Sequence, residues 1–136
     1  MLLEVKGLAV HYGGIRAVKG IDLEVDAGEL VCLIGANGAG KTSTLKAICR
    51  LIPSAATRLA YAGQDIARAR VHELPRKGLV MVPEGRGIFP QLTVQENLAI
   101  GAYARGGGDA EVQYASFPRL KERRHQIGRA SCRERV

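Results

Sequence analysis

The chain of 136 residues lacks long apolar runs and lacks a leader-like start. No stretch approaches the roughly 18 uninterrupted apolar residues of a membrane-spanning helix, so the sequence predicts no membrane span. Residues 1–6 have neither the basic start nor the long apolar centre of a secretory signal peptide. We therefore expect a cytoplasmic location.

Cysteine is also scarce. The three cysteines are Cys32, Cys49 and Cys132, an odd number in which no two lie at metal-ligand spacing. Neither a disulfide scaffold nor a zinc site is indicated. Cys32 lies in an apolar segment and Cys49 in a segment with helical spacing, so we expect both to be small core residues.

Positive charge exceeds negative charge, but unevenly along the chain. The net charge is +7, and residues 119–136 hold seven basic residues against two acidic ones, a net +5, which leaves +2 for the first 118 residues. This basic run has no aromatic residue that would stack on bases. A solvated tail is favoured over a nucleic-acid surface, so we expect no nucleic-acid partner. With 46 % apolar residues, the whole chain has the composition of an ordinary globular domain.

What the chain does contain is a complete match to the phosphate-binding loop pattern G-x-x-x-x-G-K-[ST]. The matching residues are Gly35, Ala36, Asn37, Gly38, Ala39, Gly40, Lys41 and Thr42. Glycines leave the backbone N–H groups open to an anion, and a helix that starts near Lys41 directs its positive end to the same point. Lys41 can then reach the β- and γ-phosphates, and the Thr42 hydroxyl can bind Mg²⁺.

The flanking segments decide between this interpretation and a glycine-rich turn with a chance lysine. Residues 30–34 form a short apolar run suited to a buried strand, and residues 44–52 have helical apolar spacing that ends at Pro53. A strand before the loop and a helix after it favour the phosphate-binding interpretation.

The segment before the loop predicts two strands. Residues 2–10 and 17–25 alternate between apolar and polar side chains, and residues 11–14 are typical of a turn. The expected fold class is therefore α/β, with an antiparallel β-rich start that leads into a β–loop–α unit.

The pattern is looser after Pro53. Residues 58–61 predict a short strand, residues 66–77 a helix interrupted by Pro75, and residues 79–82 a buried strand. Thr93 and Glu96 form a T-x-x-E capping box, which predicts a helix start near residue 94. Residues 106–109 are expected to end that helix.

Taken together, these segments resemble the ATP-binding subunit of an ABC transporter. The resemblance rests on Tyr12, on the phosphate loop, and on the segments Val82-Pro83-Glu84-Gly85-Arg86 and Phe89-Pro90-Gln91-Leu92-Thr93-Val94-Gln95-Glu96-Asn97-Leu98. Residues 83–86 and 117–123 are similar, more narrowly, to the subunit of high-affinity branched-chain amino acid importers. The resemblance runs from about residue 1 to about residue 126.

The resemblance implies the N-terminal portion of a P-loop NTPase of the ABC type, with an incomplete central sheet. Residues 1–92 would belong to the nucleotide-binding core and residues 93–126 to the start of a helical subdomain. Residues 127–136 do not resemble the family's continuation, and we treat them as a non-family tail. Without its neighbouring strand, the segment 30–34 would expose an apolar face.

The resemblance also implies the ligands, ATP and Mg²⁺. Residues 35–42 together with Ser43 would hold the phosphates, and Tyr12 matches the aromatic residue that stacks on adenine, with a surface or core tyrosine as the alternative. Lys41 would be a catalytic residue and Thr42 a Mg²⁺ ligand. Glu84 falls where most relatives carry a glutamine near Mg²⁺ and the attacking water, and an acidic turn residue is the equal alternative.

The implied partners are membrane-spanning permease subunits and a second ATPase subunit in a head-to-tail dimer. The implied location is the inner face of the cell membrane, as a peripheral protein. Residues 87–89 would lie in the patch that receives the membrane subunit, and a core position for Phe89 is the alternative.

Several residues of the family's hydrolytic site have no counterpart in this sequence. None of its aspartates follows a four-residue apolar strand, and no Leu-Ser-Gly-Gly signature or downstream switch histidine is present. We therefore expect this chain to bind ATP without hydrolysing it alone. Another P-loop enzyme, a GTPase or a kinase, is the alternative, although the GTPase segment Asn-Lys-x-Asp is absent. An inert or basic nucleic-acid-binding fragment is the third hypothesis.

Overall fold

The computed structural model describes residues 1–85, 87–108 and 110–127. The chain divides into two compact units, residues 1–81 and residues 82–136, and each is described by itself. Arg86, Asp109 and the predicted tail, apart from Ile127, lie outside the described residues. The division predicted at residue 92 concerns subdomains of the family and stays a prediction.

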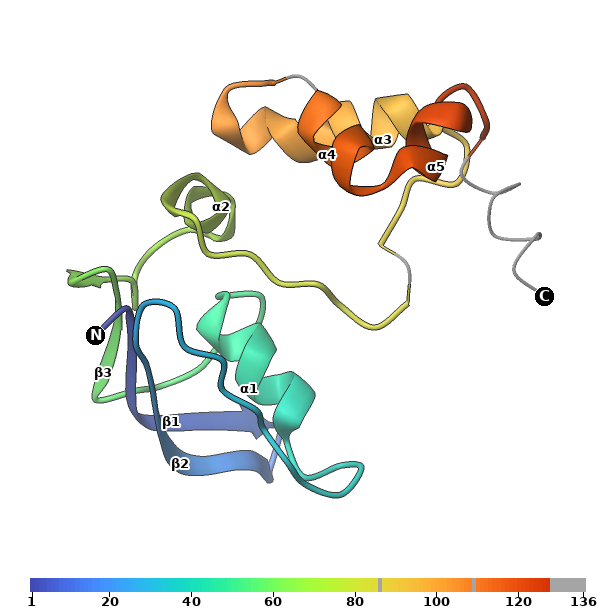
Figure 1. The fold of residues 1–136 in the computed structure, drawn as a ribbon. Helices are drawn as coiled ribbons and strands as arrows, with labels where there is room; N and C mark the ends of the chain where they lie inside the picture. Colours follow the sequence, from blue (N-terminus) through green and yellow to red (C-terminus); the bar gives the residue numbers. More distant parts are fainter. Residues whose placement is uncertain (86, 109, 128–136) are drawn as a thin grey trace. The chain divides into compact units, whose positions relative to one another are not determined.

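A four-stranded antiparallel sheet forms the base of the first unit, in the order β2-β1-β3-β4 (Figure 1). Its strands are β1 (Leu3–Tyr12), β2 (Ile15–Val25), β3 (Arg58–Tyr61) and β4 (Gln64–Asp65). The predicted strands at 2–10, 17–25 and 58–61 are confirmed, because alternating apolar residues give these segments one face to bury.

Helix α1 (Lys41–Ile48) packs against β1 and β2 and covers one face of the sheet (Figure 1). The core of this unit is aliphatic and consists of Val5, Leu8, Val10, Val18, Ala47, Ile48, Leu59, Ile66 and Leu74. The helix was predicted to run to residue 52 and ends earlier. Arg50 takes a positive φ of 60°, and the Leu51 N–H bonds back to the Lys46 carbonyl at 2.8 Å, a pattern that closes helix C-termini.

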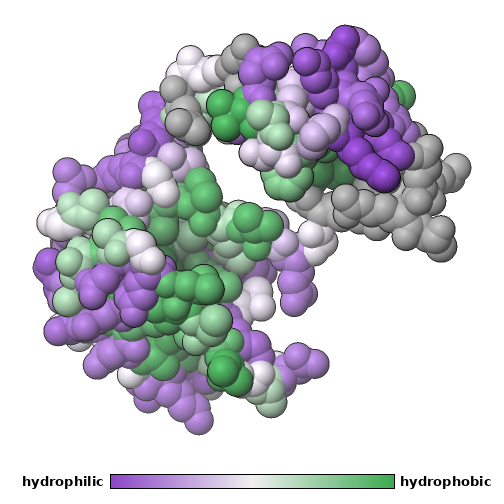
Figure 2. Space-filling view, in the orientation of Figure 1, coloured by the Kyte–Doolittle hydropathy of each residue, from purple (hydrophilic) through white to green (hydrophobic). Residues whose placement is uncertain are grey.

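Two predicted strands are wrong. Residues 30–34 and 79–82 have no strand pairing in the described part of the chain. Leu30 is 89 % exposed, Ile34 96 % and Val80 67 %. A strand needs a neighbour to satisfy its backbone groups, and apolar sequence alone cannot supply one. The exposed apolar face predicted for residues 30–34 is confirmed, and Figure 2 shows apolar side chains gathered on this unit's surface.

The segment 66–77 forms less helix than predicted. It contains the 3₁₀ turn η1 (Val71–Glu73) and the short helix α2 (Leu74–Lys77), in which Pro75 occupies the first turn. Proline is tolerated there because the first N–H groups of a helix have no intrahelical acceptor. Ile66 and Leu74 nevertheless join the core.

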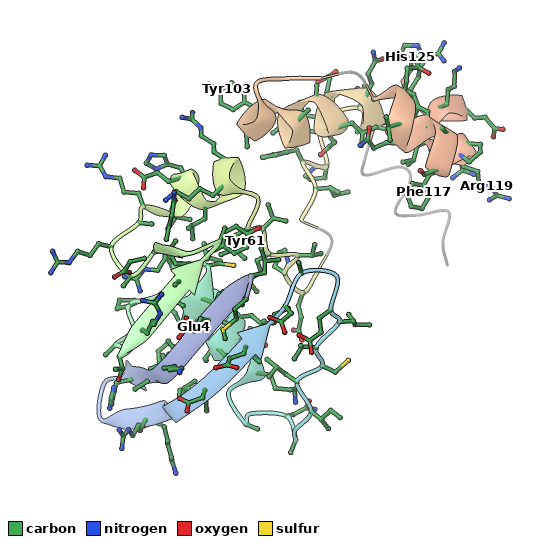
Figure 3. The ribbon with its side chains drawn as sticks, turned by 60° about the vertical axis from the view of Figure 1, so that its left-hand side comes forward. Glu4, Tyr61, Tyr103, Phe117, Arg119 and His125 are labelled. Carbon is green, nitrogen blue, oxygen red and sulfur yellow. The ribbon has the colours of Figure 1, made fainter. Side chains whose placement is uncertain are left out.

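The second unit is helical. It contains α3 (Val94–Ala102), η2 (Tyr103–Arg105), α4 (Glu111–Ser116) and α5 (Pro118–Glu122). The predicted helix start is confirmed: the Glu96 N–H donates to the Thr93 side-chain oxygen at 3.1 Å. The predicted break is confirmed at Gly106, which has a φ of 84°. The exposed side chains of Tyr103 and Phe117 project outward from these helices (Figure 3).

Candidate phosphate-binding site

The predicted phosphate loop leads directly into α1 and lies against β2. Gly40 precedes the helix with a φ of 98°, and a Cβ built on it would lie 2.6 Å from the Ala17 carbonyl oxygen and 3.3 Å from Val18 Cγ2. Ala17 and Val18 belong to β2, so only glycine lets the loop approach the sheet this closely. Val18 itself is a buried core residue.

The middle of the loop is open on its outer side. Gly38 has a φ of 84°, and a Cβ at this position would meet no atom within 4 Å. The Ala39 N–H donates to the Ala36 carbonyl at 3.1 Å. Residues 31–39 are exposed, which includes Gly35 and Asn37. Exposed backbone beside a helix N-terminus offers N–H groups to an anion, so these residues fit a phosphate group.

Lys41 is the first residue of α1, and its side chain turns back over the loop. Its ammonium group donates hydrogen bonds to the Gly35 carbonyl and, at 2.9 Å, to the Ala36 carbonyl. The first turn of α1 contains no acidic residue, so no carboxylate within that turn opposes an incoming anion. The arrangement places one positive charge at the mouth of the loop.

The two hydroxyl residues that follow differ in their surroundings. Thr42 is exposed, as an ion ligand from the solvent side would need to be. Ser43 Oγ lies 3.2 Å from the Tyr12 hydroxyl, across 31 residues of sequence. Tyr12 ends β1 and is 49 % exposed, so a core position for this tyrosine is wrong. The structure thus brings Tyr12 to the phosphate loop.

Thr44 has a role that the sequence did not predict. Its hydroxyl is buried and donates to the Gly40 carbonyl at 2.8 Å, parallel to the backbone bond from its own N–H. This pair of bonds ties the first turn of α1 to the residue that touches β2. A threonine three positions after the motif lysine was visible in the sequence, but its burial was not.

Glu84 belongs to the second unit and is exposed. Its place beside a nucleotide therefore stays a prediction. Phe89 is 52 % exposed, which removes the core alternative for this residue. The neighbouring Arg86 lies outside the described residues.

Asn97 is a second residue that sequence reasoning missed. Its side chain accepts from the Phe89 N–H at 2.8 Å and donates to the carbonyls of Phe89 at 3.1 Å and Thr93 at 2.9 Å. A further bond of 3.4 Å reaches Leu92. An asparagine near the start of a predicted helix, four residues after its N-cap, was the available signal.

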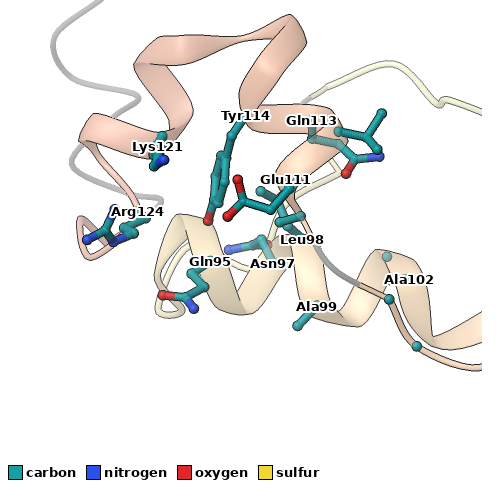
Figure 4. A pocket seen from close by; sticks show the side chains of 15 residues that line it. Gln95, Asn97, Leu98, Ala99, Ala102, Glu111, Gln113, Tyr114, Lys121 and Arg124 are labelled. Atoms are coloured by element: carbon teal, nitrogen blue, oxygen red, sulfur yellow. The ribbon is translucent and has the colours of Figure 1, made fainter.

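The second unit also contains a pocket of about 800 Å³ between α3, α4 and α5 (Figure 4). The Tyr114 ring stands in it and is 7 % exposed, and its hydroxyl has no hydrogen-bond partner within the described residues. Lys121 and Arg124 contribute the cationic part of the lining. Nothing in the sequence predicted this pocket, because it depends on how three short helices meet.

The prediction that both cysteines are core residues is wrong for Cys32, which is exposed because the strand expected around it does not form. Cys49 is only partly buried and lies outside the core cluster, although burial raises the pKa of its thiol. Within residues 1–85, 87–108 and 110–127, no group of three His, Cys, Asp or Glu side chains is arranged to hold a metal ion. Among the helices in that part of the chain, none has the length and apolar character to cross a membrane.

Comparisons with a family model and with known proteins agree on one protein family. Residues 18–135 match the model of the ABC transporter family. The chain is 40 % identical over 129 residues to the high-affinity branched-chain amino acid transport ATP-binding protein BraG of Pseudomonas aeruginosa, covering 92 % of this chain and 55 % of BraG. It is 32 % identical over 102 residues to the xylose import ATP-binding protein XylG of Shigella flexneri, covering 74 % of this chain and 20 % of XylG.

Solved structures agree in fold. An ATP-binding subunit of an ABC transporter is 32 % identical with a TM-score of 0.77, over 93 % of this chain and 54 % of that one. A nucleotide-free ATP-binding cassette reaches the same TM-score at 20 % identity, over 94 % of this chain and 58 % of that one, which supports the fold alone. The chain spans about half the length of BraG and of these structures. Because the family model covers most of the sequence, the chain belongs to the ABC transporter family and forms the N-terminal portion of its ATP-binding domain.

Proposed function

We propose that this chain is part of the ATP-binding subunit of an ABC importer for branched-chain amino acids. The observation that supports nucleotide binding is the loop at residues 35–42, in which Gly40 touches β2 and Lys41 stands over exposed backbone. The solute class is supported by the 40 % identity to BraG, which exceeds the 32 % identity to the xylose protein.

In this proposal, ATP is held by side chains and backbone of the first unit. The loop N–H groups and the Lys41 ammonium bind the phosphates, Ser43 adds a hydroxyl donor, and the Tyr12 ring offers a face to adenine. Thr42 supplies an oxygen ligand of the kind that Mg²⁺ prefers, and the role of Glu84 as a further ligand is implied by the family resemblance alone. When bound, Mg²⁺ would neutralise phosphate charge. Residues 1–136 then bind ATP without turnover, since none of their aspartates follows a run of four apolar residues.

The partners proposed are those that the family uses: permease subunits in the membrane and a second ATPase subunit packed head to tail. The location that follows is the cytoplasmic face of the cell membrane. The exposed Phe89 supports a contact with a membrane subunit, since an exposed aromatic side chain is favourable at an interface.

Calorimetric titration of the 136-residue chain with Mg-ATP tests nucleotide binding. Lys41→Ala should lower the affinity at least about tenfold, because it removes a charge-assisted contact to phosphate. Lys46→Ala is the matched control, since Lys46 lies further along α1 and its side chain is not part of the loop. Equal affinities for the Lys41→Ala variant and the unmodified chain would overturn the assignment.

The solute class needs a separate test. Disruption of the gene in its own cell should reduce the uptake of radiolabelled leucine, isoleucine or valine and leave xylose uptake unchanged. A loss of xylose uptake with intact leucine uptake would assign the importer to sugars instead.

A further inference from the structure

We propose that the Ser43 hydroxyl is a positioning group for the Tyr12 ring, holding it ready for the base of a purine nucleoside triphosphate. This inference rests on the proposed function, because it concerns the same nucleotide site. It is carried by one contact, the 3.2 Å separation of the Tyr12 hydroxyl and Ser43 Oγ. This contact joins the end of β1 directly to the first turn of α1.

Without this contact, the Tyr12 ring would be fixed at one end only. Its backbone is anchored where β1 ends, through pairing with Ile15, but the ring is half exposed. A hydrogen bond at the hydroxyl fixes the far end of the ring as well. The ring then loses its rotational freedom before a ligand arrives, so a base binds with a smaller entropic cost.

The contact also sets the distance between the two parts of the site that would bind the base and the phosphates. Ser43 follows Lys41 by two residues in the first turn of α1, whose N-terminus faces the phosphate loop. Tyr12 comes from the sheet, 31 residues earlier. The hydrogen bond joins the base side of the site to the phosphate side. Its loss should therefore weaken ligands that have a base more than ligands that have phosphates alone.

Two ligands separate these contributions: Mg-ATP and inorganic tripolyphosphate with Mg²⁺. Tyr12→Phe keeps the ring and removes the hydroxyl, and Ser43→Ala removes the other partner. Each should lower the ATP affinity about two- to tenfold relative to the tripolyphosphate affinity, the range expected for one hydrogen bond. The double variant Tyr12→Phe/Ser43→Ala should show no larger ratio than either single variant, because both remove the same bond.

Two controls make the outcome specific. Tyr61→Phe removes a tyrosine hydroxyl from β3, where Tyr61 pairs with Leu3 at the opposite end of β1 (Figure 3), and should leave both affinities unchanged. Tyr12→Ala removes the ring and should lower the ATP affinity more than Tyr12→Phe does. Circular dichroism of each variant checks that the fold is kept.

The results distinguish this inference from the proposed function. If Tyr12→Ala weakens ATP but Tyr12→Phe and Ser43→Ala do not change the ratio of affinities, the base platform stands and the positioning role is overturned. Additive losses in the double variant would overturn it too. If Tyr12→Ala leaves the ATP affinity unchanged, the base platform fails and the positioning role fails with it. If the unmodified chain binds neither ligand, the proposed nucleotide site itself fails.

Discussion

Gly40 and Ala17 are in such close contact that a Cβ on Gly40 would lie 2.6 Å from the Ala17 carbonyl oxygen. The contact joins the start of α1 to β2, and Gly40 reaches it with a φ of 98°. Two requirements, a left-handed backbone and close approach to another strand, therefore fall on the same residue. This explains physically why the last glycine of the motif is needed even before any ligand binds.

The first prediction compares two glycines of the loop. Gly40→Ala should destabilise the first unit by more than Gly38→Ala does. Gly38 has a similar φ of 84°, but a Cβ built on it would meet no atom within 4 Å. The backbone strain is about 1–2 kcal/mol at either position, and overpacking adds about 1–3 kcal/mol at Gly40 only. Urea denaturation measures the difference. Equal losses of stability would show that the approach to Ala17 is looser in solution.

A second prediction concerns Asn97, whose side-chain oxygen Oδ1 accepts a hydrogen bond from the Phe89 N–H. Asn97→Ala should increase the hydrogen-exchange rate of the Phe89 amide about two- to tenfold, since the removed bond contributes about 0.5–1.5 kcal/mol. Gln95→Ala is the matched control on the same turn of α3. An unchanged exchange rate at Phe89 in the Asn97→Ala variant would contradict the bond.

A third prediction concerns the exposed apolar segment before the loop. Ile34→Lys should reduce aggregation, measured by light scattering, because it adds a charge to an unpaired apolar segment. The free energy of unfolding should change by no more than about 0.5 kcal/mol, as is usual for an exposed position. Ile48→Lys, at a buried position, should instead unfold the first unit. Strong destabilisation by Ile34→Lys would mean that this side chain is covered in solution.

The fourth prediction concerns pH. The 2.8 Å hydrogen bond from Arg58 Nε to Glu4 Oε2 holds the pKa of the Glu4 carboxyl below its usual 4.5. The stabilisation is therefore present above pH 4.5 and is lost as the pH falls through the lower, folded-state pKa. When the free energy of unfolding is measured by denaturation at pH values down to about pH 3, Glu4→Gln should make its decline with falling pH less steep. Arg58→Gln should flatten the decline less, because Lys6, whose Nζ lies 3.7 Å from Glu4 Oε1, also lowers the pKa of Glu4. Curves parallel to that of the unmodified chain would refute the pair.

Local features of the fold were predictable where the groups that form hydrogen bonds with one another lie close together in the sequence. The first two strands form a hairpin, so their alternation was sufficient to predict their pairing. The start of α3 was predictable because Thr93 caps it within one turn. The structure of residues 30–34 and 79–82 was not predictable in this way, because an apolar run becomes a strand only beside another strand.

For the site, the sequence by itself determined the loop, since eight consecutive residues specify its backbone freedom and its charge. Only the tertiary structure decided that Gly40 meets Ala17, that Tyr12 reaches Ser43 and that Asn97 holds Phe89. Each of these contacts joins residues that lie between 8 and 31 positions apart in the sequence. Such contacts depend on how strands and helices pack, and the physical reason is that periodicity fixes which face a side chain occupies but not which neighbour it meets.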